Sequence, residues 1–257
     1  MEDVITEAAP PSRFLDEDLN NFTLPSPFLP SPFFIFSHSL SLSLSLKPTT
    51  LIISLTFPFP SLPPIASLIL PELPFSTASL HPSPPSTSVT LHSLSHHTLF
   101  ASVNSPISPD RAHAVARVLI GDRIVPDSVL ILDSIRPGNY RGRLSADEAV
   151  ALKLENLAER KRGKGEKMLE GLEYYPSGSV VDGLAAAVLA RCQVLNIRAG
   201  LCVSWPQFDA SVLSLLKGVL RNGALRGLDL DLIFSDEVFK SGKGRSKDHA
   251  FQSDLYI

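Results

Sequence analysis

Charged residues are nearly absent from one long part of this chain. Between residues 24 and 97 only Lys47 and Glu72 carry a charge, whereas the whole chain of 257 residues has 23 basic and 26 acidic residues. The formal net charge of -3 excludes a general binder of nucleic acid or of anionic membranes, because such proteins carry a basic excess. A protein partner fits this charge balance better.

Cysteine is scarce, and its spacing excludes the common metal and redox motifs. Cys192 and Cys202 have no CxxC arrangement and no cysteine or histidine at zinc-ligand spacing nearby. One falls in an apolar helical run and the other in the strand expected after it, so we interpret both as core thiols in a reducing compartment. His92, His96 and His97 lie close together, but without acidic neighbours we interpret them as solvated loop residues and not as metal ligands.

Motifs of the common enzyme classes are missing as well. There is no GxSxG nucleophile elbow, and the glycine- and lysine-rich runs at 163–167 and 242–247 do not match a phosphate-binding GxxxxGK[ST] loop. These runs are typical of flexible linkers. Ser177 and Ser179 have no assignable histidine or acidic partner. We therefore assign no catalytic, cofactor-binding or metal-binding residue, and an α/β enzyme, hydrolase or phosphorylase-like, with an unassigned active site remains the alternative.

Long apolar runs are also missing, which bears on how the chain is divided. Prolines and serines interrupt every apolar cluster before the roughly 18 to 20 residues that a membrane helix needs. The acidic, proline-bearing start is unlike a signal or transit peptide. We expect a disordered leader at residues 1–49, one α/β domain at 50–239 with poorly defined insertions at about 76–96 and 134–174, and a flexible tail at 240–257.

The clearest structural pattern is an apolar helix followed by a strand. Residues 184–195 are helix-forming and almost entirely apolar, Asp182 stands at the N-cap position, and residues 197–203 form a short run typical of a strand. A helix that is apolar nearly all round is a buried one, so we expect Ala187 and Val188 to lie against a sheet. The unit resembles half of a βαβ crossover.

Other segments continue this alternation of strands and helices. Strands are expected at residues 39–46, 50–57, 65–70, 98–103 and 128–132, and residues 228–234 suggest a last exposed strand or an extended segment. Helices are expected at residues 109–120, after Ser108 as N-cap, and at 145–160 and 210–221. The fold class predicted from this order is α/β, a three-layer arrangement of a mostly parallel sheet with helices on its faces.

Three stretches resemble the proteasome assembly chaperone 1 family. They are VVDGLAAAVLARCQVLNI at residues 180–197, SLILPELPF at residues 67–75, and the final residues DLYI. The resemblance covers roughly residues 98–257 and is patchy before that. It implies a protein without catalysis or cofactor that pairs with a sister of the same fold, proteasome assembly chaperone 2. It further implies binding to proteasome α subunits during 20S α-ring assembly, in the cytoplasm and also in the nucleus.

The last three residues, Leu255, Tyr256 and Ile257, match the hydrophobic-tyrosine-any (HbYX) pattern. In the family that the chain resembles, this pattern docks into pockets between neighbouring proteasome α subunits. A glycine-, lysine- and serine-rich linker at residues 241–246 precedes the motif and could deliver it. The resemblance therefore implies a partner-binding role for these three residues. The alternative is a frayed C-terminus with no partner.

Overall fold

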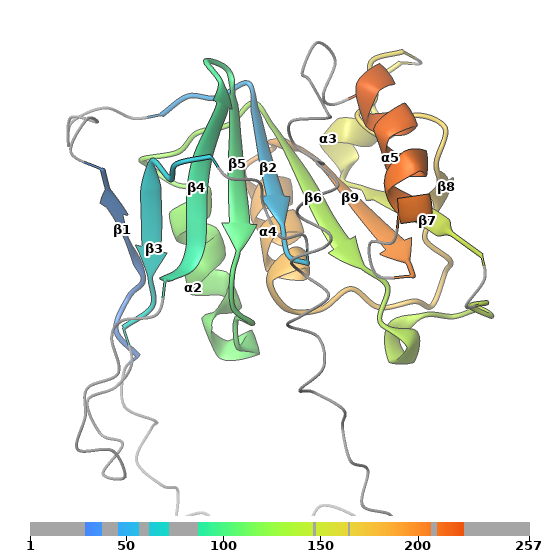
Figure 1. The fold of residues 1–257 in the computed structure, drawn as a ribbon, viewed down its shortest axis with the longest axis horizontal. Helices are drawn as coiled ribbons and strands as arrows, with labels where there is room; N and C mark the ends of the chain where they lie inside the picture. The colour runs from blue at the N-terminus through green and yellow to red at the C-terminus, as the bar shows by residue number, and fades with distance from the viewer. Residues whose placement is uncertain are drawn as a thin grey trace, which may run out of the picture.

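Nine strands form one mixed sheet in the described part of the chain, which comprises residues 29–37, 46–56, 62–71, 87–145, 148–163, 165–206 and 210–223 of a computed structural model. The strands are β1 (Phe33–Phe36), β2 (Thr50–Ser54), β3 (Ala66–Ile69), β4 (Thr87–Ser95), β5 (Thr98–Val103), β6 (Ser128–Ser134), β7 (Val150–Glu155), β8 (Glu173–Tyr174) and β9 (Arg198–Trp205). The helices are α2 (Pro109–Leu119), the 3₁₀ helix η2 (Pro137–Asn139), α3 (Leu157–Arg160), α4 (Gly183–Val194) and α5 (Ala210–Asn222). The strand order is β1-β3-β4-β5-β2-β6-β9-β7-β8 (Figure 1).

Parallel pairing holds the centre of this sheet. β2 lies between β5 and β6 and is parallel to both, and β6 is parallel to β9. Antiparallel pairing extends the sheet through β4, β3 and β1 on one side and through β7 on the other. Parallel neighbours need crossover connections, which α2 and α4 provide. The α/β class is confirmed, with a sheet that is mixed instead of mostly parallel.

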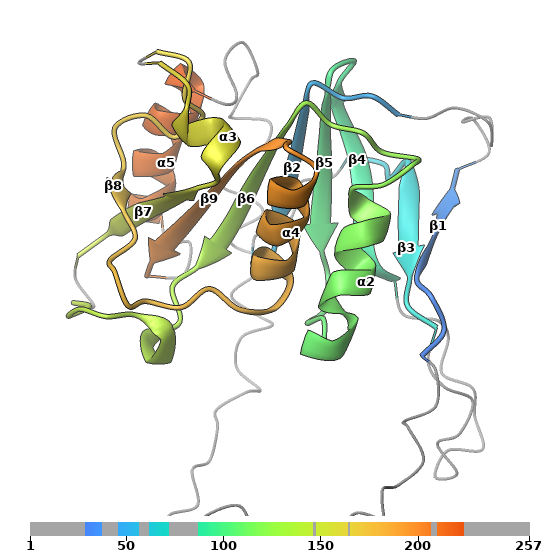
Figure 2. The same cartoon turned by 180° about the vertical axis from the view of Figure 1, so that it is seen from behind.

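Helices cover both faces of the sheet, as the three-layer prediction requires. α2 and α4 lie on one face and α5 lies on the other (Figures 1 and 2). Successive strand residues point to opposite faces, so Leu51 and Ile53 join the buried cluster under α2 and α4, whereas Ile52 joins the cluster that includes Val212 and Leu216 of α5. Each layer therefore has its own apolar core.

The helix α4 lies where the sequence predicts it, with its inner side against the sheet. Ala187 is 3% exposed and Val188 is fully buried, which confirms that prediction. The expectation that the helix is buried nearly all round is wrong, because Ala190 is exposed and Val194 is 79% exposed. Among the described elements, none covers the outer side of the last two turns.

The predicted helix at 145–160 is wrong. Residues 150–155 form β7, which pairs antiparallel with β9, and only the four residues of α3 are helical. Leucine, lysine, glutamate and alanine are strong helix formers, so local propensity favoured a helix. The alternation of VALKLE places Lys153 and Glu155 on one face of the sheet and Leu152 on the other, and pairing with β9 overrides the local preference.

Most of the other predicted elements are present. The segments 50–57, 65–70, 98–103, 128–132 and 197–203 contain strands β2, β3, β5, β6 and β9, and 109–120 and 210–221 contain α2 and α5. Of the predicted strand 39–46 only Leu46 is described, where it forms a single bridge with Ile124, and 228–234 lies outside the described residues.

Three strands come from ranges that the sequence assigned to irregular structure. β1 lies within residues 1–49, β4 lies wholly within 76–96, and β8 lies within 134–174. His92 is a residue of β4 with 6% exposure, so its interpretation as a solvated loop residue is wrong. The division into leader, domain and tail stays a prediction. No helix within the described ranges is long and apolar enough to span a membrane.

The position of Ala187 generates a stability prediction with a matched control on the same helix. Ala187→Asp places an uncompensated carboxylate against the sheet and should cost about 3 to 5 kcal/mol of unfolding free energy. Ala190→Asp faces solvent and should cost less than about 1 kcal/mol. Urea unfolding followed by circular dichroism measures both. Equal losses for the two variants would contradict the placement of α4.

Candidate functional site

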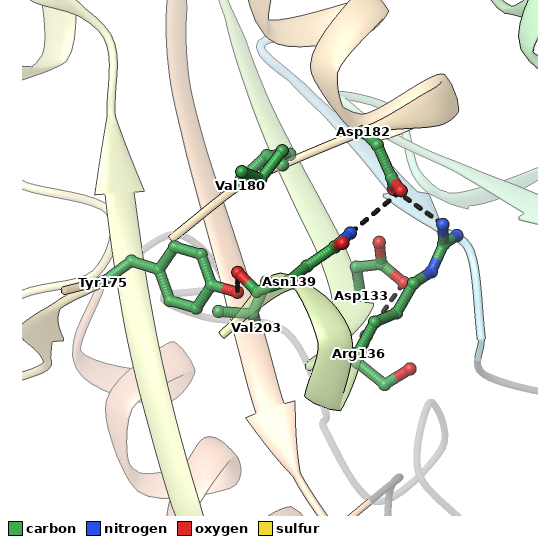
Figure 3. A pocket seen from close by; sticks show the side chains of 9 residues that line it. Asp133, Arg136, Asn139, Tyr175, Val180, Asp182 and Val203 are labelled. Carbon is green, nitrogen blue, oxygen red and sulfur yellow. Dashed lines mark hydrogen bonds and ion pairs between the residues drawn. The ribbon is translucent and has the colours of Figure 1, made fainter. Parts of the chain in front are cut away.

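A small pocket lies at the edge of the sheet where β6 and β9 end and α4 begins (Figure 3). Its lining residues are Asp133, Ser134, Arg136, Asn139, Tyr175, Val180, Val181, Asp182 and Val203. They come from the ends of two parallel strands, from η2 with its flank, and from the segment that leads into α4. α/β proteins commonly bind ligands at the carboxyl edge of their parallel strands, so the position of this pocket makes it the candidate ligand site.

The polar groups of the pocket are largely occupied with one another. Arg136 Nη1 lies 2.6 Å from Asp182 Oδ1, and Asn139 Nδ2 donates to Asp182 Oδ2 at 2.9 Å. Tyr175 Oη donates to the carbonyl oxygen of Asn139 at 3.4 Å. Asp182 stands at the N-cap position of α4, but its side chain makes no capping hydrogen bond, so the predicted cap is wrong in this respect. Charge-assisted bonds to Arg136 compete for the carboxylate.

Asp133 is the buried acid of the pocket. Asp133 is 7% exposed, and the backbone N–H of Ser134 donates a hydrogen bond to its Oδ1 at 2.8 Å. Burial raises the pKa of Asp133 above its ordinary value of 3.8, while the Ser134 N–H and the charge of Arg136 act in the opposite direction. Burial also raises the pKa of Tyr175. Burial therefore shifts the protonation equilibrium of both groups toward the neutral form.

The pocket is small, and most of its described polar groups are bonded to one another. Its cavity volume is about 20 Å³, which holds on the order of one water molecule. The described lining contains no histidine or cysteine, and Ser179, near its edge, accepts a hydrogen bond from the backbone N–H of Arg141 at 2.9 Å. In the described lining the bond between Ser134 and Asp133 comes from the Ser134 backbone N–H, and no hydrogen bond joins the Ser134 hydroxyl to a general base.

The cysteines and histidines offer no second site among the described residues. Cys192 and Cys202 are free and buried, and burial raises the pKa of each thiol to about 12, which confirms that they are core thiols. His96 and His97 are exposed in the turn between β4 and β5. In the described ranges no group of three His, Cys, Asp or Glu residues could hold a metal ion.

A buried ionic network lies away from the pocket, on the α5 side of β7. The carboxylate of Glu155 is fully buried, with Lys153 Nζ at 2.9 Å, Lys167 Nζ at 3.4 Å and the hydroxyl of Tyr174 donating at 2.8 Å. Burial alone would raise the pKa of Glu155, but hydrogen bonds from Lys153 and Tyr174 and the charges of both lysines bring it below its ordinary value. The network holds the segment after α3 against β7.

A second buried acid extends this network. Glu159 of α3 has a fully buried carboxylate that accepts from Arg198 Nε at 2.8 Å and from the backbone N–H of Met168 at 2.7 Å. The interpretation of 163–167 as a flexible linker is therefore wrong for Lys167, which is tied to β7. The sequence hid this role because the lysine lies in a run of exposed charges, and its partner lies in a strand predicted as helix.

Exposed apolar side chains gather in two places. On the edge strand β1, Phe33 is 48% exposed and Ile35 is 54% exposed. Where α4 ends beside α3, Leu157, Val194 and Leu195 are 53%, 79% and 42% exposed. Neighbouring exposed apolar residues are typical of surfaces that contact other protein segments.

Leu255, Tyr256 and Ile257, the partner-binding residues predicted from the sequence, lie outside the described residues. Their role in docking stays a prediction. The same holds for the glycine-rich run at 242–247.

The geometry defines an α/β protein without a developed catalytic pocket in its described part, and comparison with solved structures agrees with the fold. No family model and no curated protein matches the chain. A protein of unknown function from Thermoplasma acidophilum is similar at 15% identity and a TM-score of 0.53, over 79% of this chain and 85% of that one.

PbaA from Pyrococcus furiosus, an archaeal homolog of proteasome-assembly chaperone, is similar at 12% identity and a TM-score of 0.52, over 84% of this chain and 88% of that one. At these identities the likeness shows a shared fold.

The buried acid of the pocket generates a pH-dependent prediction. Because the folded-state pKa of Asp133 is raised, wild type should lose stability as pH rises from about 3.8 through that raised value. Asp133→Asn keeps an oxygen for the Ser134 N–H without the buried charge. It should be more stable than wild type at pH 7, and the difference should close as pH falls below 3.8. Thermal unfolding between pH 3.5 and 7 measures this, with exposed Asp127→Asn as the control. A difference that is constant with pH would exclude the burial effect.

Proposed function

We propose that this chain is a proteasome assembly chaperone subunit that binds proteasome α subunits and promotes assembly of the 20S α ring. It acts as a heterodimer with a sister chaperone of the same fold, proteasome assembly chaperone 2. The observation that carries the proposal is the fold shared with PbaA, an archaeal homolog of proteasome-assembly chaperone. The stretch at 180–197 that resembles the chaperone family contains all of α4, the helix that covers the centre of the sheet.

Binding fits the described surface better than catalysis does. The pocket at the carboxyl edge of β6 and β9 holds on the order of one water molecule, and its charges are paired internally. In contrast, the edge strand β1 exposes the large apolar side chains of Phe33 and Ile35. The position of the pocket is the observation that favours an α/β enzyme, hydrolase or phosphorylase-like, and its size and its occupied polar groups weigh against one.

The C-terminal tail supplies the chemistry for contact with α subunits. Leu255 offers apolar surface, Tyr256 offers a ring with a hydroxyl group, and the α-carboxylate of Ile257 is ionised at neutral pH and can pair with a basic group in a subunit pocket. The linker at 241–246 separates this motif from the folded part of the chain. Docking by the tail and folding of the domain should therefore be independent.

Pairing with the sister chaperone predicts that the isolated chain is a poor monomer. An exposed apolar interface should be buried when the two chains are produced together, because the partner removes it from water. Co-expression should raise the yield of folded chain, and the pair should elute together in size-exclusion chromatography. A stable monomer that elutes separately from the sister chaperone would argue against the heterodimer.

The docking role of the tail is tested in a pull-down of proteasome α subunits. Deleting residues 255–257, or adding one residue after Ile257, should weaken recovery of α subunits while the melting temperature and the heterodimer stay unchanged. Tyr256→Ala should cost on the order of 1 to 4 kcal/mol of binding free energy if the ring is a buried anchor. Gln252→Ala, outside the motif, is the matched control. Equal recovery with the truncated and intact chains would remove the tail from the proposal.

A further inference from the structure

The exposed apolar side chains at the α3/α4 end come from two segments that are hydrogen-bonded to each other. The backbone N–H of Leu157 donates to Gln193 Oε1 at 3.0 Å, which fastens the start of α3 to the last turn of α4. Asn156 Nδ2 donates to the carbonyl oxygen of Ile197 at 2.7 Å, just after that turn. We call Leu157, Val194 and Leu195 the α3/α4 patch. Among the described elements, nothing covers it.

The surroundings of this patch are basic. Arg160, Lys161 and Arg162 begin three residues after Leu157 and are exposed, and Arg162 Nη1 lies 3.5 Å from the exposed carboxylate of Glu166. The nearest acid of α3, Glu159, is buried and paired with Arg198, so it contributes no exposed negative charge. An occupant that combines apolar residues with carboxylates would match both parts of this surface.

The chain beyond α5 has this composition. Residues 228–237 read LDLDLIFSDE, in which every second residue from Leu228 to Leu232 is apolar and four residues are acidic. In an extended chain the alternating leucines share one side, which leaves the aspartates on the other. We call residues 228–237 the acidic segment. They lie outside the described residues, so their position is a matter for experiment.

The end of α5 delivers the chain close to the patch. Gly223 lies so near Met168 that a side chain at Gly223 would collide with the Met168 carbonyl oxygen, and the N–H of Met168 is bonded to Glu159 of α3. Figures 1 and 2 show α5 and α4 ending at the same end of the sheet, with α3 at that end. Leu228 is five residues beyond Gly223, within reach of about 17 Å.

We infer that the acidic segment of this chain docks on its own α3/α4 patch, with its leucines on Leu157, Val194 and Leu195 and its carboxylates toward Arg160, Lys161 and Arg162. The inference does not depend on the proposed function, because it concerns two parts of one chain. Its consequence is that the folded chain gains an apolar cover, and that the tail after residue 237 leaves the molecule from this end.

Disulfide trapping in the full chain tests the docking. The chain suits this method because burial raises the pKa of Cys192 and of Cys202 to about 12, which leaves engineered surface cysteines as the reactive thiols. The test pair is Val194→Cys with Leu230→Cys. The control pair is Val180→Cys with Leu230→Cys, since Val180 is 56% exposed but precedes α4, a helix of 12 residues that is about 18 Å long.

Under mild oxidation the test pair should form an intrachain disulfide at least about tenfold faster than the control pair, at a rate independent of protein concentration. Leu157→Cys with Leu230→Cys is a second test pair on the same patch, and it should also exceed the control. Adding Asp229→Lys and Asp231→Lys to either test pair should slow the reaction several-fold.

Two results would overturn the inference. Equal rates in test and control pairs would show that the segment has no preference for the patch. Cross-linked dimers whose yield rises with protein concentration would show that a second copy, and not the same chain, occupies it.

Discussion

The fold depends on β2, which is held along its whole length between two parallel neighbours. Thr50 pairs with Thr98 of β5 and with Ser128 of β6, and the register continues without a break to Ser54. A strand in this position has no free edge and must bury both faces, which explains why its three central residues, LII, are uninterrupted apolar. Because β2 lies between β5 and β6, the connection through α2 passes over β2 on one face of the sheet. α2 therefore lies beside α4, which covers the same face.

Burial of two carboxylates imposes a second constraint, on the far side of the sheet. The carboxylates of Glu155 and Glu159 are shielded from water. Because a buried charge is costly, each is stable in the interior only when it is paired with its cationic and hydrogen-bonding partners. Apart from Lys153 of β7 itself, those partners come from residues 167–174 and from β9, and they fix residues 167–174 against the sheet. Electrostatic pairing here does the work that apolar packing does under α4.

The sequence predicts those parts of the fold where local pattern and tertiary environment agree. The apolar run at 184–195 contains most of α4, and the largely apolar runs at 98–103 and 128–132 form β5 and most of β6. β7 could not be predicted because its residues prefer a helix and only the pairing with β9 makes them a strand. The pocket could not be predicted from the sequence either. Folding brings together Asp133, Tyr175 and Asp182, which are far apart in the chain and form no sequence motif.

The two cysteines divide between the two layers of the core. Cys192 of α4 belongs to the larger cluster, and Cys202 of β9 belongs to the cluster under α5. A thiol that is closed to solvent and protonated reacts only when its surroundings open. The chain thus carries one native reporter in each layer, and their separate rates of alkylation register whether the α4 layer and the α5 layer unfold together or one after the other.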